Sequence, residues 1–223
     1  MNVQFIKEIQ LARTVDPVHH AKRRDQILDA LEDAVLELGF PRLSFKDVAQ
    51  RCGLSQGLLN YYFKDKTEMI LWLQWRVLET YNDRLWTVTH GTAPAPQRLQ
   101  GLLELLLSPT PELFRNIRIF LQLEAEALTN PSVEHGMKLY LRGFQDAMAR
   151  VLSGLPWWLE ASQEARMDTV AFSVSLIKGA YVQALFTDQP RILTLTHGQL
   201  VPILLNGAMS PSSIQADAVP EAS

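Results

Sequence analysis

The 223-residue sequence contains a single cysteine, Cys52. One cysteine cannot form an internal disulfide and provides no cluster of thiolates for a structural zinc ion. Cys52 lies on the packing face of a short predicted helix, so we interpret it as a core residue and not as a nucleophile. The sequence therefore predicts neither a disulfide-stabilised scaffold nor a metal site.

The sequence signatures of enzymes are also missing. There is no Gly-rich phosphate loop, no nucleophile elbow and no spacing of His, Cys, Asp and Glu that is typical of metal ligands. We therefore expect a protein that is not an enzyme and that needs no cofactor.

Long apolar runs are scarce as well. No stretch approaches the roughly 20 consecutive apolar residues that a membrane helix needs. Residues 1–16 mix charged and apolar side chains where a signal peptide would have one apolar block. These patterns predict a cytoplasmic protein without a membrane partner.

Alternation of apolar and polar residues, the pattern typical of strands, does not extend over any useful length. Apolar residues recur instead at helical spacing along most of the chain. We predict an all-α fold of about nine helices. The predicted helices cover residues 23–38, two short segments between 44 and 63, then 65–89, 97–107, 112–129, 133–153, 163–187 and 191–206.

The most informative stretch is SFKDVAQRCGLSQGLLNYYFKDK, which begins at Ser44. Ser44 is a suitable N-cap, and Asp47 three residues later complements the start of the helix. Gly53 can adopt the left-handed conformation that ends this helix. Ser55 caps a second short helix, and Asp65 repeats the capping pattern for a third. Three caps around one glycine turn predict a helix-turn-helix.

This stretch resembles the DNA-binding signature of the tetracycline-repressor (TetR) family. The resemblance implies that the second short helix lies in the major groove of double-stranded DNA. The residues that it assigns to DNA contacts are Ser44, Ser55, Gln56, Gly57, Leu58, Asn60, Tyr61, Tyr62 and Lys66. Gln56 can bond two edges of an adenine, and Leu58 can touch a thymine methyl group. Tyr61, Tyr62 and Lys66 match family positions that contact phosphates.

Two positions depart from the common family pattern, an aromatic residue followed by His-Tyr-Phe. Asn60 replaces the first aromatic residue, and Tyr61 replaces the histidine. The motif is intact, but no operator sequence can be carried over from other members. A three-helix packing unit that binds nothing would have the same caps and apolar spacing. The polar and aromatic residues without a packing role favour DNA binding over that alternative.

The charge distribution fits this interpretation. The net charge is −3, which by itself does not suggest a DNA-binding protein. Residues 1–66 carry ten Lys and Arg against nine Asp and Glu, whereas the remaining residues carry eleven against fifteen. We therefore expect a DNA-binding end on a mildly acidic body.

The resemblance implies two domains flanked by two terminal segments. We predict a leader over residues 1–20 and a three-helix helix-turn-helix DNA-binding domain over residues 21–66. A helical ligand-binding and dimerisation domain follows over residues 67–208. The small, polar and acidic residues 209–223 predict a disordered tail.

The second domain is expected to enclose a ligand cavity lined by aromatic and methionine side chains. Any single aromatic or methionine residue of this domain can also be interpreted as part of an ordinary helix-bundle core. The candidate lining residues are Trp72, Trp75, Phe120, Glu124, Tyr140, Phe144, Met148, Phe172 and Tyr181. Glu124 lies in the middle of an apolar helix face, where an unpaired carboxylate is costly. Either a cationic ligand with cation–π support or an internal arginine or tyrosine would compensate it.

Residues 163–187 and 191–206 are the expected dimer helices. The apolar stripe expected on the first of them comprises Val170, Val174, Ile177 and Tyr181. A two-fold homodimer presents two recognition helices to successive major grooves and prefers a palindromic operator. The combined prediction is a repressor released from its operator by a small hydrophobic or cationic effector. The alternative is a helical ligand- or protein-binding module without specific DNA binding.

Overall fold

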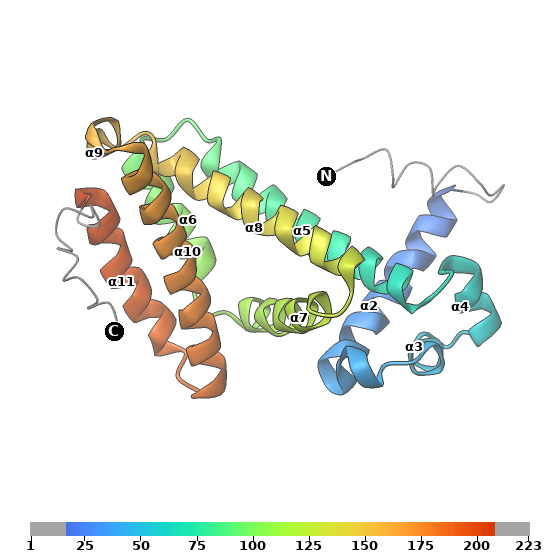
Figure 1. Cartoon of the computed structure of the whole chain (residues 1–223). Coiled ribbons are helices and arrows are strands. Elements are labelled where there is room, and N and C mark those ends of the chain that lie inside the picture. The colour runs from blue at the N-terminus through green and yellow to red at the C-terminus, as the bar shows by residue number, and fades with distance from the viewer. Residues whose placement is uncertain (1–16, 208–223) are drawn as a thin grey trace, which may run out of the picture. The chain divides into compact units, whose positions relative to one another are not determined.

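The computed structural model describes residues 17–207, which form ten helices and contain no strand (Figure 1). The first four helices are α2 (Pro17–Arg42), α3 (Phe45–Cys52), α4 (Gln56–Tyr62) and α5 (Lys66–Thr89). The other six are α6 (Ala95–Leu107), α7 (Pro111–Ala127), α8 (Pro131–Leu152), α9 (Pro156–Glu160), α10 (Gln163–Phe186) and α11 (Arg191–Asn206). The predicted all-α class is confirmed.

Two features of the helices differ from the prediction. Helix α2 begins at Pro17, so residues 17–20 of the predicted leader are helical. Residues 1–16 of the leader and the predicted tail lie outside the described residues. The short helix α9 was missed because Pro156 suggested a break, whereas proline at the first position of a helix supplies a suitable φ angle and loses no hydrogen bond.

The chain divides into two compact units. Among the described residues, the first unit comprises residues 17–81 and 115–141, and the second comprises residues 82–114 and 142–207. Helices α5, α7 and α8 each contribute residues to both units. The predicted domain boundary near residue 66 stays a prediction.

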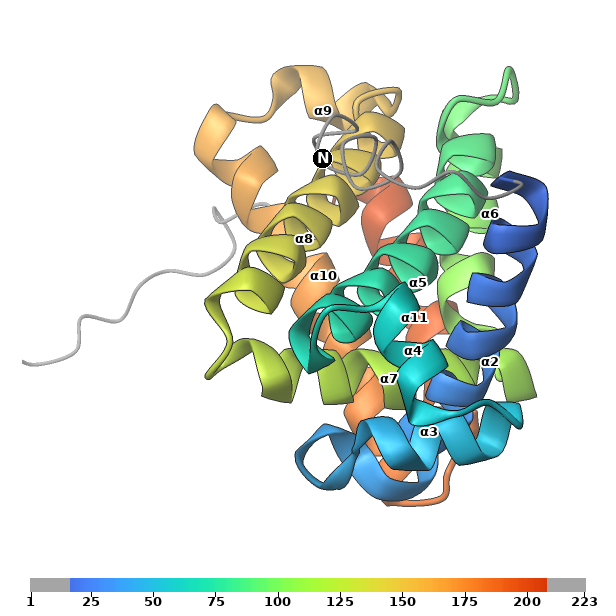
Figure 2. The same ribbon diagram turned by 90° about the vertical axis from the view of Figure 1, so that its right-hand side faces the viewer.

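The first unit has one continuous apolar core. Buried side chains come from α2, α3, α4, α5, α7 and α8; they include Ile27, Leu31, Val35, Val48, Leu59, Met69, Leu73, Ile119, Leu123 and Val133. Burial of each large apolar side chain stabilises the fold by about 1.5–3 kcal/mol relative to leaving it exposed. Figures 1 and 2 both show α3 beside the C-terminal half of α2, and α4 follows next to α3. The helix-turn-helix is therefore anchored on α5 and α7 by a shared core.

The second unit is built on contacts of α11 with α6 and α10. Its core is mainly leucine, with Leu99, Leu102, Leu103, Leu106, Val174, Ile177, Leu193, Leu200 and Leu204 buried. Two side-chain donors reinforce this packing. The Tyr181 hydroxyl donates to the Leu106 carbonyl at 2.7 Å, and the Trp157 indole donates to the Leu204 carbonyl at 2.7 Å. Tyr181 is thus engaged with the backbone of α6.

Helix α10 is, within residues 17–207, the helix long and apolar enough to cross a membrane. The sequence did not predict such a helix because Lys178 and several Ser and Thr residues interrupt the apolar run. Length and composition do not distinguish a membrane helix from a core helix. One face of α10 is packed inside the second unit, where Val174 and Ile177 are buried.

Candidate DNA interface and effector site

The N-terminus of α3 is closed by the predicted capping box. The Ser44 hydroxyl accepts a hydrogen bond from the Asp47 amide at 3.3 Å, and the Asp47 carboxylate accepts one from the Ser44 amide at 2.9 Å. The Ser44 hydroxyl also donates to this carboxylate, and these bonds lower the pKa of Asp47. Gly53 ends α3 at a φ angle of 65°, as predicted. Together these contacts set the turn that leads into α4.

Helix α4 is held by its inner face and presents its outer face to solvent. Ser55 caps it by accepting from the Leu58 amide at 3.2 Å. Leu59 and Phe63 are fully buried in the core of the first unit. The outward residues Ser55, Gln56, Gly57, Leu58 and Asn60 are all exposed. Leu58 is 40% exposed, although it is a large apolar residue next to a buried one.

The predicted phosphate contacts lie at the C-terminal end of α4 and the start of α5. Tyr61 and Tyr62 are half-buried and meet edge to face, with ring centroids 5.4 Å apart. The Lys66 ammonium donates to the Phe40 carbonyl near the end of α2. Lys66 therefore ties α5 to α2 within the protein, a role that the sequence did not indicate. Lys64, between α4 and α5, and Lys46, in the first turn of α3, are both exposed.

Two of the predicted effector-site residues, Phe120 and Tyr140, meet in the first unit. Phe120 of α7 and Tyr140 of α8 stack with centroids 4.8 Å apart. Tyr81 of α5 lies 5.8 Å from Phe120 and 6.2 Å from Tyr140. We call Tyr81, Phe120 and Tyr140 the aromatic cluster. Burial among these rings, with smaller contributions from Tyr81 and the Glu124 carboxylate, raises the pKa of Tyr140 well above its ordinary value.

The sequence missed Tyr81 as a member of this cluster. It belongs to the same helix as Trp72 and Trp75, but these two tryptophans form a separate edge-to-face pair with centroids 5.5 Å apart. The Arg24 guanidinium of α2 lies 4.0 Å from the centre of the Trp72 ring. Trp72 is also part of the core of the first unit. The structure thus gives Trp72 a packing role beside α2.

The remaining predicted lining residues belong to the second unit. Phe144 and Met148 are buried there. Phe172 is 55% exposed, because α10 turns its opposite face, with Val174 and Ile177, toward the core. Its side chain therefore lies at the surface of this chain and not in its interior.

The orientation of α10 also shows that the predicted dimer stripe was wrong. Val170, Val174 and Ile177 are buried inside the chain and are not available to a partner. The exposed apolar side chains of α10 are instead Met167, Phe172, Leu176, Val182 and Phe186. Both faces of this helix are apolar, so apolar spacing alone could not decide which of them is buried.

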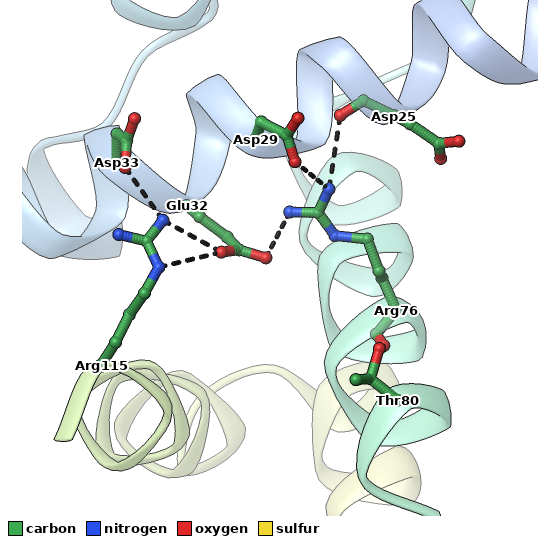
Figure 3. Close-up of polar contacts among 7 residues, drawn as sticks. All are labelled: Asp25, Asp29, Glu32, Asp33, Arg76, Thr80 and Arg115. Carbon is green, nitrogen blue, oxygen red and sulfur yellow. Dashed lines mark hydrogen bonds and ion pairs between the residues drawn. The ribbon is translucent and has the colours of Figure 1, made fainter. Parts of the chain in front are cut away.

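An ion-pair network that the sequence did not reveal connects α2 with α5 and α7 (Figure 3). Arg76 of α5 bonds to Asp29 at 2.7 Å and to one carboxylate oxygen of Glu32. Arg115 of α7 bonds to the other oxygen of Glu32 at 3.0 and 3.3 Å, and to Asp33 at 2.9 Å. Burial opposes the charge of Arg115, but the bonds to Asp33 and Glu32 outweigh it and raise the pKa of Arg115.

No metal site accompanies these features: across residues 17–207 there is no group of three or more His, Cys, Asp or Glu side chains placed to hold an ion. One surface presents exposed side chains on α4, and one cluster places aromatic rings near the Glu124 carboxylate.

Comparison with known proteins places these features in a known context. Residues 27–72 match the model for bacterial regulatory proteins of the tetR family. A 96-residue segment is 34% identical to the HTH-type transcriptional regulator PksA of Bacillus subtilis, over 43% of this chain and 46% of that protein. The HTH-type transcriptional regulator BetI of Klebsiella pneumoniae is 25% identical over 177 residues, which cover 78% of this chain and 87% of BetI.

Two solved structures share the fold over most of the chain. A TetR transcription regulator from Haloarcula marismortui aligns with a TM-score of 0.72 and 18% identity, covering 84% of this chain and 98% of that one. A transcriptional regulator from Saccharomonospora viridis, solved in complex with choline, aligns with a TM-score of 0.72 and 21% identity, covering 82% and 96%. At these identities the likeness establishes the fold alone.

Proposed function

The chain belongs to the TetR family of DNA-binding transcriptional regulators, and from this premise we propose that it is a homodimeric repressor that an organic cation releases from a palindromic operator. It regulates transcription and is not an enzyme. We further propose that it acts in the cytoplasm. The observation that carries the proposal is α4, a capped helix whose outer side chains are exposed while Leu59 anchors it.

The exposed N-terminal half of α4 suits base reading in the major groove. Gln56 offers an amide that can pair with an adenine in two hydrogen bonds, a contact that discriminates between bases by about 1–3 kcal/mol. Leu58 has the apolar, exposed side chain that a thymine methyl group requires. We expect the N-terminus of α3 at Ser44 and the tyrosines after Asn60 to contact phosphates, which set register and orientation.

The exposed apolar face of α10 supports dimerisation. It presents Phe172, Leu176 and Phe186 to solvent, and Gly179 between them allows a second helix to approach closely. A contiguous apolar face of this kind marks an interaction surface. The same face on a second copy gives a two-fold dimer, whose recognition helices read two half-sites about one helical turn of DNA, or a multiple of it, apart.

The aromatic cluster with Glu124 suits an organic cation. Ring faces attract a quaternary ammonium group, and a nearby carboxylate balances its charge. The regulator from Saccharomonospora viridis with the same fold was solved with choline, a ligand of this class. Phe120 and Tyr140 are stacked on each other in this structure, so a cation between them must first separate them. Effector binding therefore favours a different arrangement of α7 and α8.

Such a preference is enough to switch a repressor. A shift of the dimer from almost entirely DNA-competent to almost entirely incompetent needs about a 10⁴-fold difference in effector affinity between the two states. A cation that binds only the separated rings has this kind of state preference.

The test begins with selection of binding sites from random duplex DNA. Fluorescence anisotropy then compares the selected site with a scrambled duplex at several salt concentrations. We expect a palindrome bound at least about 10³-fold more tightly than the scramble. Equal, purely salt-driven affinity for both duplexes would instead indicate a helical binding module without specific DNA recognition.

Choline then tests the effector class, with its neutral isostere 3,3-dimethyl-1-butanol as the matched control. We expect choline, but not the neutral alcohol, to weaken operator binding. The Glu124→Gln variant should bind the operator normally and respond less to choline. Equal responses of the parent and Glu124→Gln would remove Glu124 from the effector site, and no response to choline would remove this cation as effector.

A further inference from the structure

We infer that Glu32 is a positioning residue that holds the DNA-binding helices on α5 and α7, and that effector binding reaches these helices through the Arg115–Glu32 contact. The second half of this inference rests on the proposed function, because it presupposes an effector at the aromatic cluster. The first half concerns the free protein alone. Both halves start from the geometry of Figure 3.

Glu32 differs from its acidic neighbours in exposure and in connectivity. Its side chain is 18% exposed, whereas Asp29 is 74% exposed and Asp33 is 59% exposed. Each carboxylate oxygen of Glu32 serves a different arginine, so one residue of α2 joins α5 and α7. Exposed ion pairs contribute little, but a partly buried carboxylate with several charge-assisted bonds leaves its partners uncompensated when it is removed.

Helix α7 touches α2 at a second point two turns further along. The Gln122 side chain lies against Gly39, where a Cβ atom would come within 3.2 Å of its Oε1. Arg115 and Gln122 are seven residues apart and therefore share one face of α7. Ile119 lies between them on that face and is fully buried. This side of α7 is thus in contact with α2 over about two turns.

The opposite face of α7 carries the proposed effector contacts. Phe120 and Glu124 lie roughly half a turn around the helix from Arg115 and Gln122, by the 3.6-residue period. A helix packed on both sides moves as a unit, since protein interiors resist local deformation. Separation of Phe120 from Tyr140 therefore displaces Arg115 relative to Glu32. The structure in this way joins the aromatic cluster to α2 by one helix.

The test compares Arg115→Met with Arg84→Met in the full chain. Arg84 forms an ion pair with Glu112 at 2.6 Å in the second unit, so its loss removes the same kind of contact without touching α2. Hydrogen–deuterium exchange of the free proteins needs neither operator nor effector. We expect faster exchange of α2 and α3 amides in Arg115→Met and unchanged exchange there in Arg84→Met. Identical α2 exchange in the two variants would overturn the positioning role.

A second readout separates positioning from simple loss of stability. Anisotropy titrations use the selected operator and versions with one or two base pairs added between the half-sites. A merely destabilised variant loses affinity for all spacings alike. We expect Arg115→Met and Glu32→Gln to lose the preference for the correct spacing, and Arg115→Lys to recover part of it. Retention of the parental spacing preference would contradict the inference.

The coupling is measured with choline as the probe. We expect Arg115→Met to bind choline within about twofold of the parent by calorimetry, yet to lose most of the choline effect on operator affinity, which allosteric coupling commonly places at about 5–150-fold. The double variant with Glu32→Gln should lose no more than either single variant. If choline has no effect on the parent, the proposed effector is rejected. The positioning role of Glu32 is then tested by the exchange and spacing experiments alone. A full choline effect in Arg115→Met would reject the relay.

Discussion

Helices α4 and α7 are used in opposite ways. Helix α4 buries only Leu59 and leaves the residues of its outer face exposed. Helix α7 is engaged on two sides, with Arg115 and Gln122 toward α2 and Phe120 toward the aromatic cluster. The proposed function of α4, base reading, therefore rests on side chains that are exposed to solvent. The proposed function of α7, coupling between two sites, rests on the contacts that it makes with α2 and within the aromatic cluster.

This difference predicts how each helix responds to substitution. Changes on the outer face of α4 should alter DNA binding and spare the fold. Changes on α7 should alter the fold or the coupling between sites, since every face except the outermost has a neighbour. The following variants test this contrast, beginning with the largest expected effect.

Adjacent leucines of α4 provide the sharpest test of its two faces. Leu59→Ala removes a fully buried side chain and should lower the free energy of unfolding by about 2–5 kcal/mol. Leu58→Ala, at a residue 40% exposed, should change it by less than about 0.5 kcal/mol and weaken operator binding instead. Urea unfolding, followed by circular dichroism, measures the stability of the two variants, and anisotropy titration measures their operator binding. Similar destabilisation by the two variants would contradict the contrast between the buried and exposed faces of α4.

The exposed amide of α4 tests base reading. Gln56→Ala should weaken binding of the selected operator by about 1–3 kcal/mol and leave the stability of the protein unchanged. Arg118→Ala, at an exposed residue of α7, is the matched control and should alter neither property. Anisotropy titration at fixed salt measures the affinity. An equal affinity of Gln56→Ala and the parent would exclude Gln56 from the interface.

The capping box tests how α3 supports α4. Ser44→Ala should cost about 1 kcal/mol of stability at neutral pH, because the Asp47 amide loses its acceptor. The hydrogen bonds from Ser44 lower the pKa of Asp47, so their stabilisation is present above the unfolded-state pKa of about 3.8 and is lost as the pH falls through the folded value. The difference in thermal stability between the parent and Ser44→Ala should therefore shrink as the pH falls from 7 to 2.5. A constant difference would contradict this assignment.

The smallest expected effect concerns the aromatic cluster on the other side of α7. The raised pKa of Tyr140 means that the fold favours its neutral form. Its contribution is complete below pH 10 and is lost as the pH rises above the ordinary tyrosine value of about 10. The Tyr140→Phe variant should therefore lose less thermal stability than the parent between pH 9 and pH 11. Parallel loss in both would show that Tyr140 is not shielded from solvent.

The sequence predicted α3 and α4 well because their signals are local. Ser44, Asp47 and Gly53 act within a few residues of one another, and the structure confirms each role. The network around Glu32 could not be predicted in this way, since Arg115 lies 83 positions along the chain. Charged residues at such separations give no sign of which partner they meet. Their pairing depends on how the helices pack.

The body helices show a second limit of the sequence. Helix α10 is apolar on two faces, so its spacing could not reveal that Val174 is buried in the chain and Phe172 exposed. The aromatic cluster was predicted in part, through Phe120 and Tyr140. Tyr81 was not predicted because the residue pattern of a single helix does not show which other helices it contacts, here α7 and α8.

The most direct measurement is a second selection from random duplex DNA with the Gln56→Ala variant in place of the parent. Base reading by α4 predicts that the palindrome and its half-site spacing persist, while the preference at one base pair in each half-site is lost. Identical base preferences for the parent and the variant would contradict the account, because α4 would then contact DNA without reading it.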